Sequence, residues 1–203
     1  MDVKQSRRHE QTEGTRRALL RVARDQFTRY GYDGAKTEQI VRRARVTRGA
    51  LYHHFPAGKK ELFRAVFEEL EQQLVREVAD VSMGQPDMWS MSVAGLRAFL
   101  DACMEPAVQR IVLLDAPSVL GWDAWRVIDE RYGFAILRGM LESSMVEGVI
   151  RTQPLDALAH VMLGALNEGA LLIARSGDPG STRAEVEASL LALMEGLRTS
   201  PGT

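Results

Sequence analysis

The sequence predicts an all-α protein in which a small N-terminal helix-turn-helix domain of three helices is followed by a larger helical domain. Apolar residues recur at helical spacing along most of the 203 residues, whereas runs with the period of a strand are almost absent. An apolar content of 45% over this length is enough for one good core and a small satellite domain.

The N-terminal end of the chain is polar. Residues 1–11 lack an apolar face, so we expect them to form a disordered basic arm. Lys4, Arg7 and Arg8 would allow this arm to follow a nucleic-acid backbone or enter a minor groove, although an inert terminus is an equally open interpretation. The first helix is expected over residues 12–30. Its inward positions are Leu19, Leu20, Ala23 and Phe27.

Residues 37–60, TEQIVRRARVTRGALYHHFPAGKK, contain two short amphipathic helices joined by a tight turn and followed by a third that starts at a lysine. In the first of these helices Ile40 and Ala44 recur at helical spacing, and Thr37 is the expected N-cap. This arrangement is typical of a helix-turn-helix that reads DNA. We therefore predict a DNA-binding domain over residues 12–58.

The second short helix has an inward and an outward face. Val46, Leu51 and Phe55 are expected to face the core, and Thr47 is the expected cap. The outward positions are Arg48, Gly49, Tyr52 and His53. The small residues at positions 49 and 50 would let the N-terminal turn approach base edges in a major groove.

The segment of about residues 15–70 resembles the DNA-binding domain of the TetR family of transcriptional regulators. The residues that carry the resemblance are Phe27, Gly31, Tyr32, Thr37, Ile40, Ala44, Val46, Gly49, Leu51, Tyr52, His53, His54, Phe55, Glu61 and Leu62, with a lysine before the last two. The resemblance implies that the second short helix is the recognition helix, and that Thr37 and Lys59 touch phosphates. The predicted DNA-binding residues are Thr37, Thr47, Arg48, Gly49, Ala50, Tyr52, His53, His54 and Lys59.

The chain departs from the family pattern at two places. Arg45 stands where the family usually has glycine, and a left-handed backbone conformation at a non-glycine residue costs roughly 1 kcal/mol. The connection over residues 55–59 resembles a variant one residue longer than the common form, so that either Lys59 or Lys60 is in place to meet a phosphate at the start of the next helix.

Charge is distributed unevenly along the chain. Residues 1–60 carry fifteen Lys and Arg against six Asp and Glu, a net +9, whereas residues 61–203 carry eleven against twenty-one, a net −10. The overall charge of −1 is therefore the sum of a basic N-terminal part and an acidic remainder. Polyanions are attracted to the basic part. A solvated basic face is the simpler interpretation of such a run, but its coincidence with the recognition-helix pattern favours DNA.

The remainder of the chain also scans as helices. A helix over residues 59–80 joins the two domains, and a loop at residues 82–87 follows, where Gly84 and Pro86 break the pattern. Thr182 and Glu185 are spaced as a capping box. The second domain is predicted over residues 81–203, with helices at about 88–104, 106–114, 122–147, 154–176 and 182–198.

The helix at 154–176 predicts an interface between two copies of the chain. Its sequence is nearly all apolar or small, and a helix with few solvent-ready positions is buried on more than one side. An ordinary central core helix is the alternative interpretation, while the family resemblance implies a homodimer with two recognition helices in successive major grooves. The predicted interface residues are Ala157, Val161, Gly164, Ala165, Glu168 and Leu172.

The stretch from residue 88 to 145 is enriched in methionine and aromatic residues, which suit an apolar pocket for a small-molecule effector and equally suit a plain core. Asn167 interrupts an apolar helix, and its partner is a ligand, another subunit or a neighbouring helix. The predicted ligand-binding residues are Trp89, Phe99, Met104, Trp122, Trp125, Phe134 and Asn167. A ligand that favours one conformation would release the DNA, with the helix at 59–80 as the lever.

Other classes of protein are disfavoured. The chain has no phosphate loop, dinucleotide fingerprint, HExxH or paired CxxC, so we expect no catalytic residues, no cofactor and no metal. Adjacent His53 and His54 point about 100° apart on a helix, and no third ligand is near in sequence. The remaining alternative is an all-helical adaptor or ligand-binding protein without sequence-specific DNA binding, which would have no reason to keep an outward Arg48 and Tyr52.

The last two expectations concern the single cysteine and the cellular compartment. The single cysteine, Cys103, excludes an intramolecular disulfide and is interpreted as a packed structural thiol. We find no signal-peptide pattern and expect no run of residues long enough to cross a bilayer, so the chain is predicted to be cytoplasmic and without a membrane partner.

Overall fold

The computed structural model describes the backbone of residues 3–199 and the side chains of residues 10–128 and 130–199. This range is helical apart from turns, short connections and an isolated bridge between Ile150 and Arg198. The all-α prediction is confirmed. The helical segments in chain order are α1 (Val3–Gly34), α2 (Thr37–Ala44), α3 (Arg48–His54), α4 (Lys59–Met83), α5 (Met88–Ala102), η1 (Val108–Asp115), α6 (Ala116–Leu120), α7 (Trp122–Asp129), η2 (Glu130–Phe134), α8 (Ala135–Val146), α9 (Leu155–Arg175) and α10 (Pro179–Glu195).

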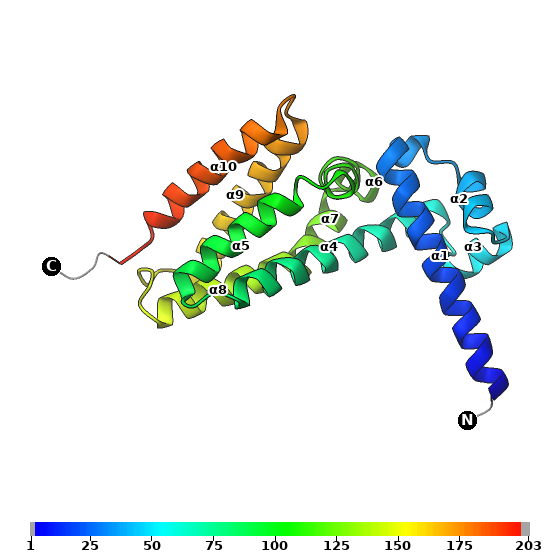
Figure 1. Ribbon diagram of the computed structural model, residues 1–203, viewed down its shortest axis with the longest axis horizontal. Helices are drawn as coiled ribbons and strands as arrows, with labels where there is room; N and C mark the ends of the chain where they lie inside the picture. Colours follow the sequence, from blue (N-terminus) through cyan, green and yellow to red (C-terminus); the bar gives the residue numbers. More distant parts are fainter. Residues whose placement is uncertain (1–2, 200–203) are drawn as a thin grey trace.

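Figure 1 shows an elongated molecule with the short helices α2 and α3 at one end and a bundle of α5, α8, α9 and α10 at the other. The long helix α4 runs from the first end into the bundle. Near its start α4 packs on α1, and farther along it lies against α5. Both ends of the molecule are therefore built on one helix.

Helix α1 is longer than the sequence predicts. Residues 3–11, for which we expected disorder, form the first turns of α1, while residues 1–2 lie outside the described range. Lysine, glutamine, arginine and glutamate in this stretch are good helix formers, and extending an existing helix avoids the cost of nucleation. Gly31 interrupts the helical backbone near the other end of α1, with φ 67° and ψ 176°.

The helix starts confirm one predicted cap and correct two others. Thr47 accepts a hydrogen bond from the Ala50 N–H at 3.1 Å and caps α3 as expected. Thr37 is instead the first residue of α2, because Lys36 holds the extended cap position. The expected capping box at Thr182 is absent, since α10 begins three residues earlier.

Asp178 and Pro179 account for the earlier start of α10. The Asp178 carboxylate accepts a hydrogen bond from the Ser181 N–H at 3.2 Å, and Pro179 occupies the first turn, where its missing N–H costs nothing. An aspartate followed by proline is itself a strong start signal, and it precedes the threonine on which the prediction relied.

Two segments of π-helix alter the predicted layout of the middle of the chain. The helix expected to end at residue 114 continues through η1 into α6, and the single helix expected at 122–147 consists of α7, η2 and α8. Pro117 lies in the first turn of α6, directly after the wider turns of η1. In a π-helix each backbone hydrogen bond spans five residues instead of four. A sequence pattern that assumes 3.6 residues per turn does not detect this change.

The main core runs through both ends of the molecule. Phe27 from α1 packs edge-on against Phe63 from α4, with ring centroids 5.1 Å apart. The same buried cluster continues through Val108, Ile111 and Val112 of η1 to Trp125 of α7. The N-terminal helices are thus packed directly on the beginning of the second domain.

Helix α9 is long and apolar enough to cross a membrane by length and composition, which contradicts the expectation that no such run exists. In the structure it packs on α8, α10, η1 and η2. Ala159, Ala170 and Ile173 are fully buried in these contacts. A packed core helix passes the same test of length and composition, and these contacts account for the apolar residues on its buried side.

Candidate nucleic-acid interface and ligand cavity

Helix α3 presents its polar face to solvent. Leu51 is fully buried, while Arg48, Gly49, Tyr52 and His53 are exposed, with 43% of Tyr52 accessible. Ala50 is half-buried behind them, and the exposed Thr47 side chain holds the first turn. A helix of this kind, with a small residue in its first turn and polar side chains facing outward, fits the dimensions of a major groove.

Arg48 is held over this face by its neighbours. Its guanidinium lies 5.8 Å from the centroid of the Tyr52 ring, and one nitrogen is 3.7 Å from a carboxylate oxygen of Glu38 on α2. A hydrogen bond with Tyr52, followed by the charge of Glu38, raises the pKa of Arg48 above its ordinary value. Because the ion pair is long and exposed, it is weak and easily exchanged for another acceptor.

The two histidines of α3 differ in environment. His53 is exposed, whereas His54 is half-buried, and their rings meet edge-on at 5.4 Å. Burial lowers the pKa of His54 below its ordinary value, and the nearby charges of His53 and Arg16 lower it further. The lowered pKa favours the neutral imidazole, which presents donor or acceptor nitrogens.

The turn between α2 and α3 places Arg45 in the left-handed region, with φ 57° and ψ 40°. The Val46 N–H then donates to the carbonyl oxygen of Val41 at 3.0 Å, which closes the end of α2. This is the C-terminal helix stop that usually uses glycine. Arg45 adopts the same geometry at the cost of some strain.

Thr37 and Lys59 are less available than the resemblance implies. Thr37 is half-buried at the start of α2. The Lys59 ammonium donates to the carbonyl oxygens of Tyr32 at 2.7 Å and Ala35 at 3.1 Å, and burial lowers its pKa. Lys59 therefore ties α4 to the end of α1, whereas the adjacent Lys60 is exposed.

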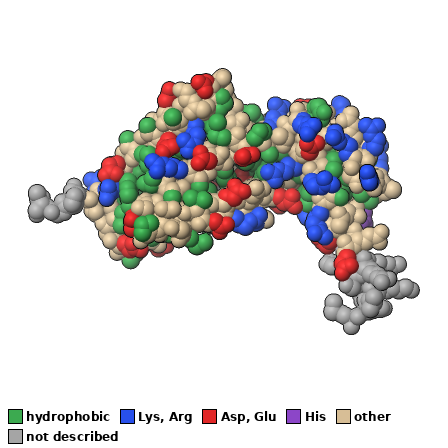
Figure 2. Space-filling view, viewed as in Figure 1, with side chains coloured by type: hydrophobic (Ala, Val, Ile, Leu, Met, Phe, Trp, Pro, Cys, Tyr) green, Lys and Arg blue, Asp and Glu red, His purple; other side chains and the backbone are tan. Residues whose placement is uncertain are grey.

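The charge asymmetry of the sequence appears on the surface. In Figure 2 Lys and Arg side chains gather over the end that holds α1, α2 and α3, while Asp and Glu are spread over the bundle. Long-range attraction would thus bring a polyanion to the end of the molecule where the outward face of α3 lies.

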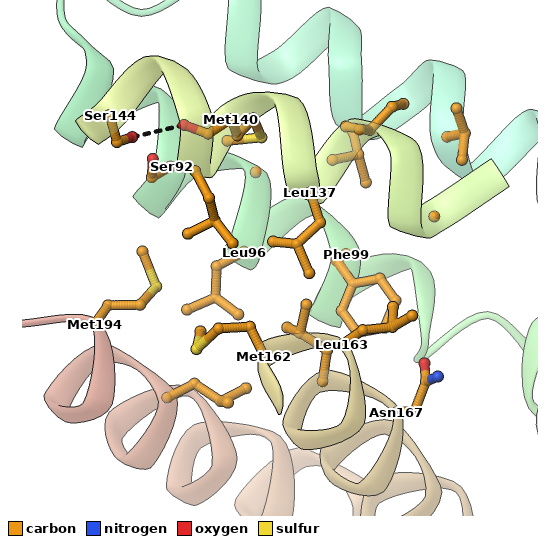
Figure 3. A pocket seen from close by; sticks show the side chains of 18 of the residues that line it. Ser92, Leu96, Phe99, Leu137, Met140, Ser144, Met162, Leu163, Asn167 and Met194 are labelled. Atoms are coloured by element: carbon orange, nitrogen blue, oxygen red, sulfur yellow. Dashed lines mark hydrogen bonds between the residues drawn. The ribbon is translucent and has the colours of Figure 1, made fainter. Parts of the chain in front are cut away.

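A cavity of about 140 Å³ lies in the bundle between α4, α5, α8, α9 and α10. Leu96, Phe99, Leu137, Met140 and Met162 make up much of its apolar wall (Figure 3). A pocket that is mostly apolar with a few polar groups is the usual form of a small-molecule site.

Three of the predicted ligand-binding residues line this cavity, namely Trp89, Phe99 and Asn167. The other four lie outside its lining, three of them on helices that direct them elsewhere and Met104 in the turn after α5. Trp125 is buried in the main core and Trp122 is exposed beside it, Phe134 stacks on His160 with centroids 4.4 Å apart, and Met104 packs beside α5 and α10.

A groove, also of about 140 Å³, adjoins the cavity at Asn167. Trp122, Trp125 and His160 contribute to it, and Leu163 and Asn167 line both the groove and the cavity. These two residues of α9 therefore border both the cavity and the groove.

The prediction overlooked Glu71, which lines the cavity from α4 and is only 3% exposed. A signal for it exists in the sequence, because Glu71 interrupts the apolar stripe of α4 that runs through Phe67, Leu74 and Val78. A charged residue at an inward helical position is uncommon and marks a polar contact inside the protein.

The outer face of α9 carries the residues predicted for a subunit interface. Ala157, Val161, Gly164, Glu168 and Leu172 are exposed, with 69% of Val161 and 53% of Leu172 accessible, and Ala165 is half-buried at their edge. On α10 Leu193 is also exposed, at 56%. Large apolar side chains on two neighbouring helices form the kind of patch that marks a protein contact.

Two contacts fasten the N-terminal helices to the second domain. The Tyr32 N–H donates to the Asp115 carboxylate at 2.7 Å, and the Arg110 guanidinium lies against Gly31. Arg110 and Asp115 also pair with each other, at 3.3 Å. Because a side chain at position 31 would collide with Arg110, glycine is needed there for this approach as well as for its positive φ.

Neither cysteine nor metal chemistry is indicated in the described part of the chain. Cys103 is fully buried, and burial together with the charge of Glu71 raises the pKa of its thiol to about 12. Within the described residues no group of three or more His, Cys, Asp or Glu is arranged to hold a metal ion.

Comparison with known proteins agrees with this geometry. Residues 19–66 match the family "Bacterial regulatory proteins, tetR family", and residues 89–197 match "Tetracyclin repressor-like, C-terminal domain". A crystal structure of a TetR-family transcriptional regulator from Pectobacterium atrosepticum is 33% identical to this chain, covers 95% of it and 98% of its own length, and superposes with a TM-score of 0.83.

Two further similarities are more distant. The transposon Tn10 TetC protein of Escherichia coli is 25% identical over 165 residues, which cover 79% of this chain and 81% of that protein. The crystal structure of RolR in complex with its ligand resorcinol is 19% identical, covers 91% of this chain and 89% of that one, and shares the fold with a TM-score of 0.68.

The chain belongs to the TetR family, and it is a DNA-binding transcriptional regulator with an N-terminal helix-turn-helix and a C-terminal ligand-binding domain. The family is one of regulators rather than enzymes, and its members act as soluble dimers.

Proposed function

We propose that this regulator binds duplex DNA by inserting α3 into a major groove. The single observation that carries the proposal is the exposed face of α3, on which Arg48, Tyr52 and His53 lie together at the end of the molecule where Lys and Arg gather in Figure 2. Gly49 and Ala50 let the first turn of α3 come close to base edges, with Thr47, Thr37 and His54 at the margin of the contact.

The start of α4 supplies a phosphate contact in this proposal. Lys59 was the predicted residue, but two of its three protons are bound to carbonyl oxygens. Lys60 is exposed at the same helix start and carries the contact, while Lys59 keeps α1 and α4 in the right relative position.

The DNA-bound form is a homodimer in which α9 and α10 of two copies pair. Support comes from the exposed apolar residues on these two helices, among them Val161, Leu172 and Leu193. A two-fold dimer places its two copies of α3 about 34 Å apart, one turn of the double helix, and predicts a palindromic operator. The protein acts as a cytoplasmic repressor.

A small molecule bound in the bundle cavity releases the DNA. Helix α4 supplies one wall of the cavity, through Leu74 and Val78, and its other end is packed on α1. A ligand that fits only one position of α4 therefore changes the separation of the two recognition helices. Couplings of this kind are typically worth 1–3 kcal/mol. RolR, which shares the fold, was solved with its ligand resorcinol, and this supports a small molecule as the effector class.

Selection of bound fragments from random duplex DNA tests the proposal. The expected result is a palindromic consensus whose affinity falls with salt, with a slope of roughly −0.9 in log K against log salt for each neutralised phosphate. A matched control is the double variant Arg48→Ala and Tyr52→Ala, which should recover no consensus. Weak retention without a salt slope would instead indicate a helical adaptor, and the proposal would be abandoned.

A further inference from the structure

We propose that Asp115 is a positioning residue for DNA binding. By accepting a hydrogen bond from the Tyr32 backbone, it fixes the angle between the N-terminal helices and the bundle, and it thereby selects the spacing of the two half-sites in the operator. This inference rests on the proposed function, since spacing matters only to a dimer that places two copies of α3 on one duplex.

Tyr32, near the end of α1, is held by three contacts. Its N–H donates to the Asp115 carboxylate at 2.7 Å, and its carbonyl oxygen accepts from the Lys59 ammonium at 2.7 Å. Its ring packs edge-on against the ring of Phe63, with centroids 5.2 Å apart. Two of these contacts come from the first turns of α4, and the third, with Asp115, is made by the second domain.

The backbone at Gly31 and the side chain of Arg110 complete this contact. Gly31 departs from helical geometry, and the N–H that follows it, that of Tyr32, is directed at Asp115. The Arg110 guanidinium occupies the space that a side chain at position 31 would need, and its Nε lies 3.3 Å from the Asp115 carboxylate. The carboxylate is therefore oriented by Arg110 on its own helix while it accepts from Tyr32 on α1.

The hydrogen bond supplies a direction that the apolar packing around it lacks. Buried side chains of α1 and η1 belong to one core, but apolar contact is non-directional and lets packed helices tilt and slide. A hydrogen bond weakens steeply when donor and acceptor are misaligned. The Asp115 side chain is only 14% exposed, which strengthens the bond because water competes little for the carboxylate. The contact therefore restrains an angle that α4 and the core leave free.

The bundle side of the contact is firmly supported. Asp115 is the last residue of η1, and Val108, Ile111 and Val112 of the same segment are buried. Helix α9, which lines the ligand cavity, packs on η1. A positioning residue needs a rigid element behind it, and η1 provides one.

The angle of the N-terminal helices matters because the dimer binds DNA at two points. Two binding modules joined stiffly have a high effective concentration at one separation, whereas a looser joint lowers that concentration and accepts more separations. Loss of the Asp115 contact should therefore cost affinity for the palindrome and broaden the accepted spacing. The contact of a single α3 with a half-site should not change.

Fluorescence anisotropy of the full-length protein on three kinds of duplex tests this inference: the selected palindrome, a single half-site, and palindromes with one base pair added to or removed from the spacer. Asp115→Ala should bind the half-site as the wild type does. It should bind the palindrome at least about tenfold more weakly, the scale of a lost hydrogen bond to a charged group, and discriminate less between spacers. An equal loss on half-site and palindrome, or an unchanged preference for one spacer, overturns the inference.

Two further variants assign the effect to the hydrogen bond. Asp115→Asn keeps an oxygen that can accept from Tyr32 and should lie closer to the wild type than Asp115→Ala does. Asp101→Ala is the matched control, because it removes an aspartate whose ion pair with Arg183, at 2.6 Å, joins α5 to α10. It should keep the wild-type spacing preference. If Asp115→Asn is as defective as Asp115→Ala, or if Asp101→Ala loses the preference as well, the role of this hydrogen bond is refuted.

The half-site also reports whether a variant is folded. If Asp115→Ala fails to bind it, Arg110→Ala replaces that variant, since the Arg110 side chain is 46% exposed and its loss leaves the Asp115 carboxylate without its orienting partner. The same broadening of spacer preference is expected, and its absence contradicts the inference. A wild type that prefers no palindrome over a half-site disproves the proposed function, whereas a selective wild type with equally selective variants disproves only the role of Asp115.

Discussion

Arg48 and Tyr52 share a face of α3 but should differ in what they recognise. The guanidinium has the fork of donors that suits a base edge, and its exposed ion pair with Glu38 is easily given up. We predict that Arg48→Ala weakens operator binding by about 1–3 kcal/mol and relaxes the preference at particular base pairs. Tyr52→Ala should weaken binding to all sequences alike. Both outcomes are measured by fluorescence anisotropy on operator variants, and identical profiles for the two would show that Arg48 meets only phosphate.

Cys103 gives a prediction about reactivity. With a thiol pKa of about 12, only about one molecule in 10⁴ carries the reactive thiolate at pH 8. We expect an aromatic disulfide reagent to leave the native protein unlabelled for hours and to label it fully after denaturation. Labelling of the native protein at the rate of a free cysteine would disprove the buried, structural role of this thiol.

At the level of elements, the end of α2 stores strain. Arg45 is the one non-glycine residue with positive φ in the described chain, so glycine there should relieve the conformation. We predict that Arg45→Gly raises the free energy of unfolding by about 0.5–1 kcal/mol, measured by urea denaturation. Arg43→Gly, an exposed position with helical backbone in the last turn of the same helix, is the control and should lower it by up to about 1 kcal/mol. If both variants lose stability equally, the turn is not strained.

The elements themselves could largely be predicted, because apolar spacing, glycine and proline report local structure directly. Helices α2 to α5 and α9 begin or end close to their expected positions. The predicted helix boundaries were wrong where helix extension or an irregular hydrogen-bond pattern set the observed structure. Residues 3–11 continue α1, since extending a helix costs less than nucleating one, and η1 and η2 have a different hydrogen-bond period from the regular helices that the pattern assumes.

For the whole molecule, the exposed apolar face of α9 and α10 predicts dimerisation. A glutamate in place of Leu172, one turn from Glu168 on this face, would put a second negative charge into the contact when two copies meet. Leu172→Glu should therefore shift the protein from dimer to monomer in sedimentation experiments and reduce operator affinity at least tenfold. Val146→Glu, at a position of α8 that is 83% exposed, is the control and should leave both unchanged. A dimeric Leu172→Glu would place the interface elsewhere.

The arrangement of the whole molecule also explains how a ligand site and a DNA site can communicate. The main core runs from α1 into η1 and α7, and Asp115 binds the backbone of Tyr32. In the proposed mechanism, movement of the bundle would reach the N-terminal helices through these packed side chains as well as along α4. The sequence suggested α4 as the lever but contained no sign of this second connection.

The sequence by itself determined the all-helical class, the outward face of α3, the basic N-terminal part and the small-residue face of α9. Each of these depends on residues close together in the chain, whose spacing reports which side of a helix they occupy. Only the tertiary structure decided which helices enclose the cavity, that Glu71 lines it while Trp122 and Phe134 do not, and that Lys59 is bound to carbonyl oxygens. Those outcomes depend on how helices rotate and pack against partners distant in sequence, and no local pattern contains that information.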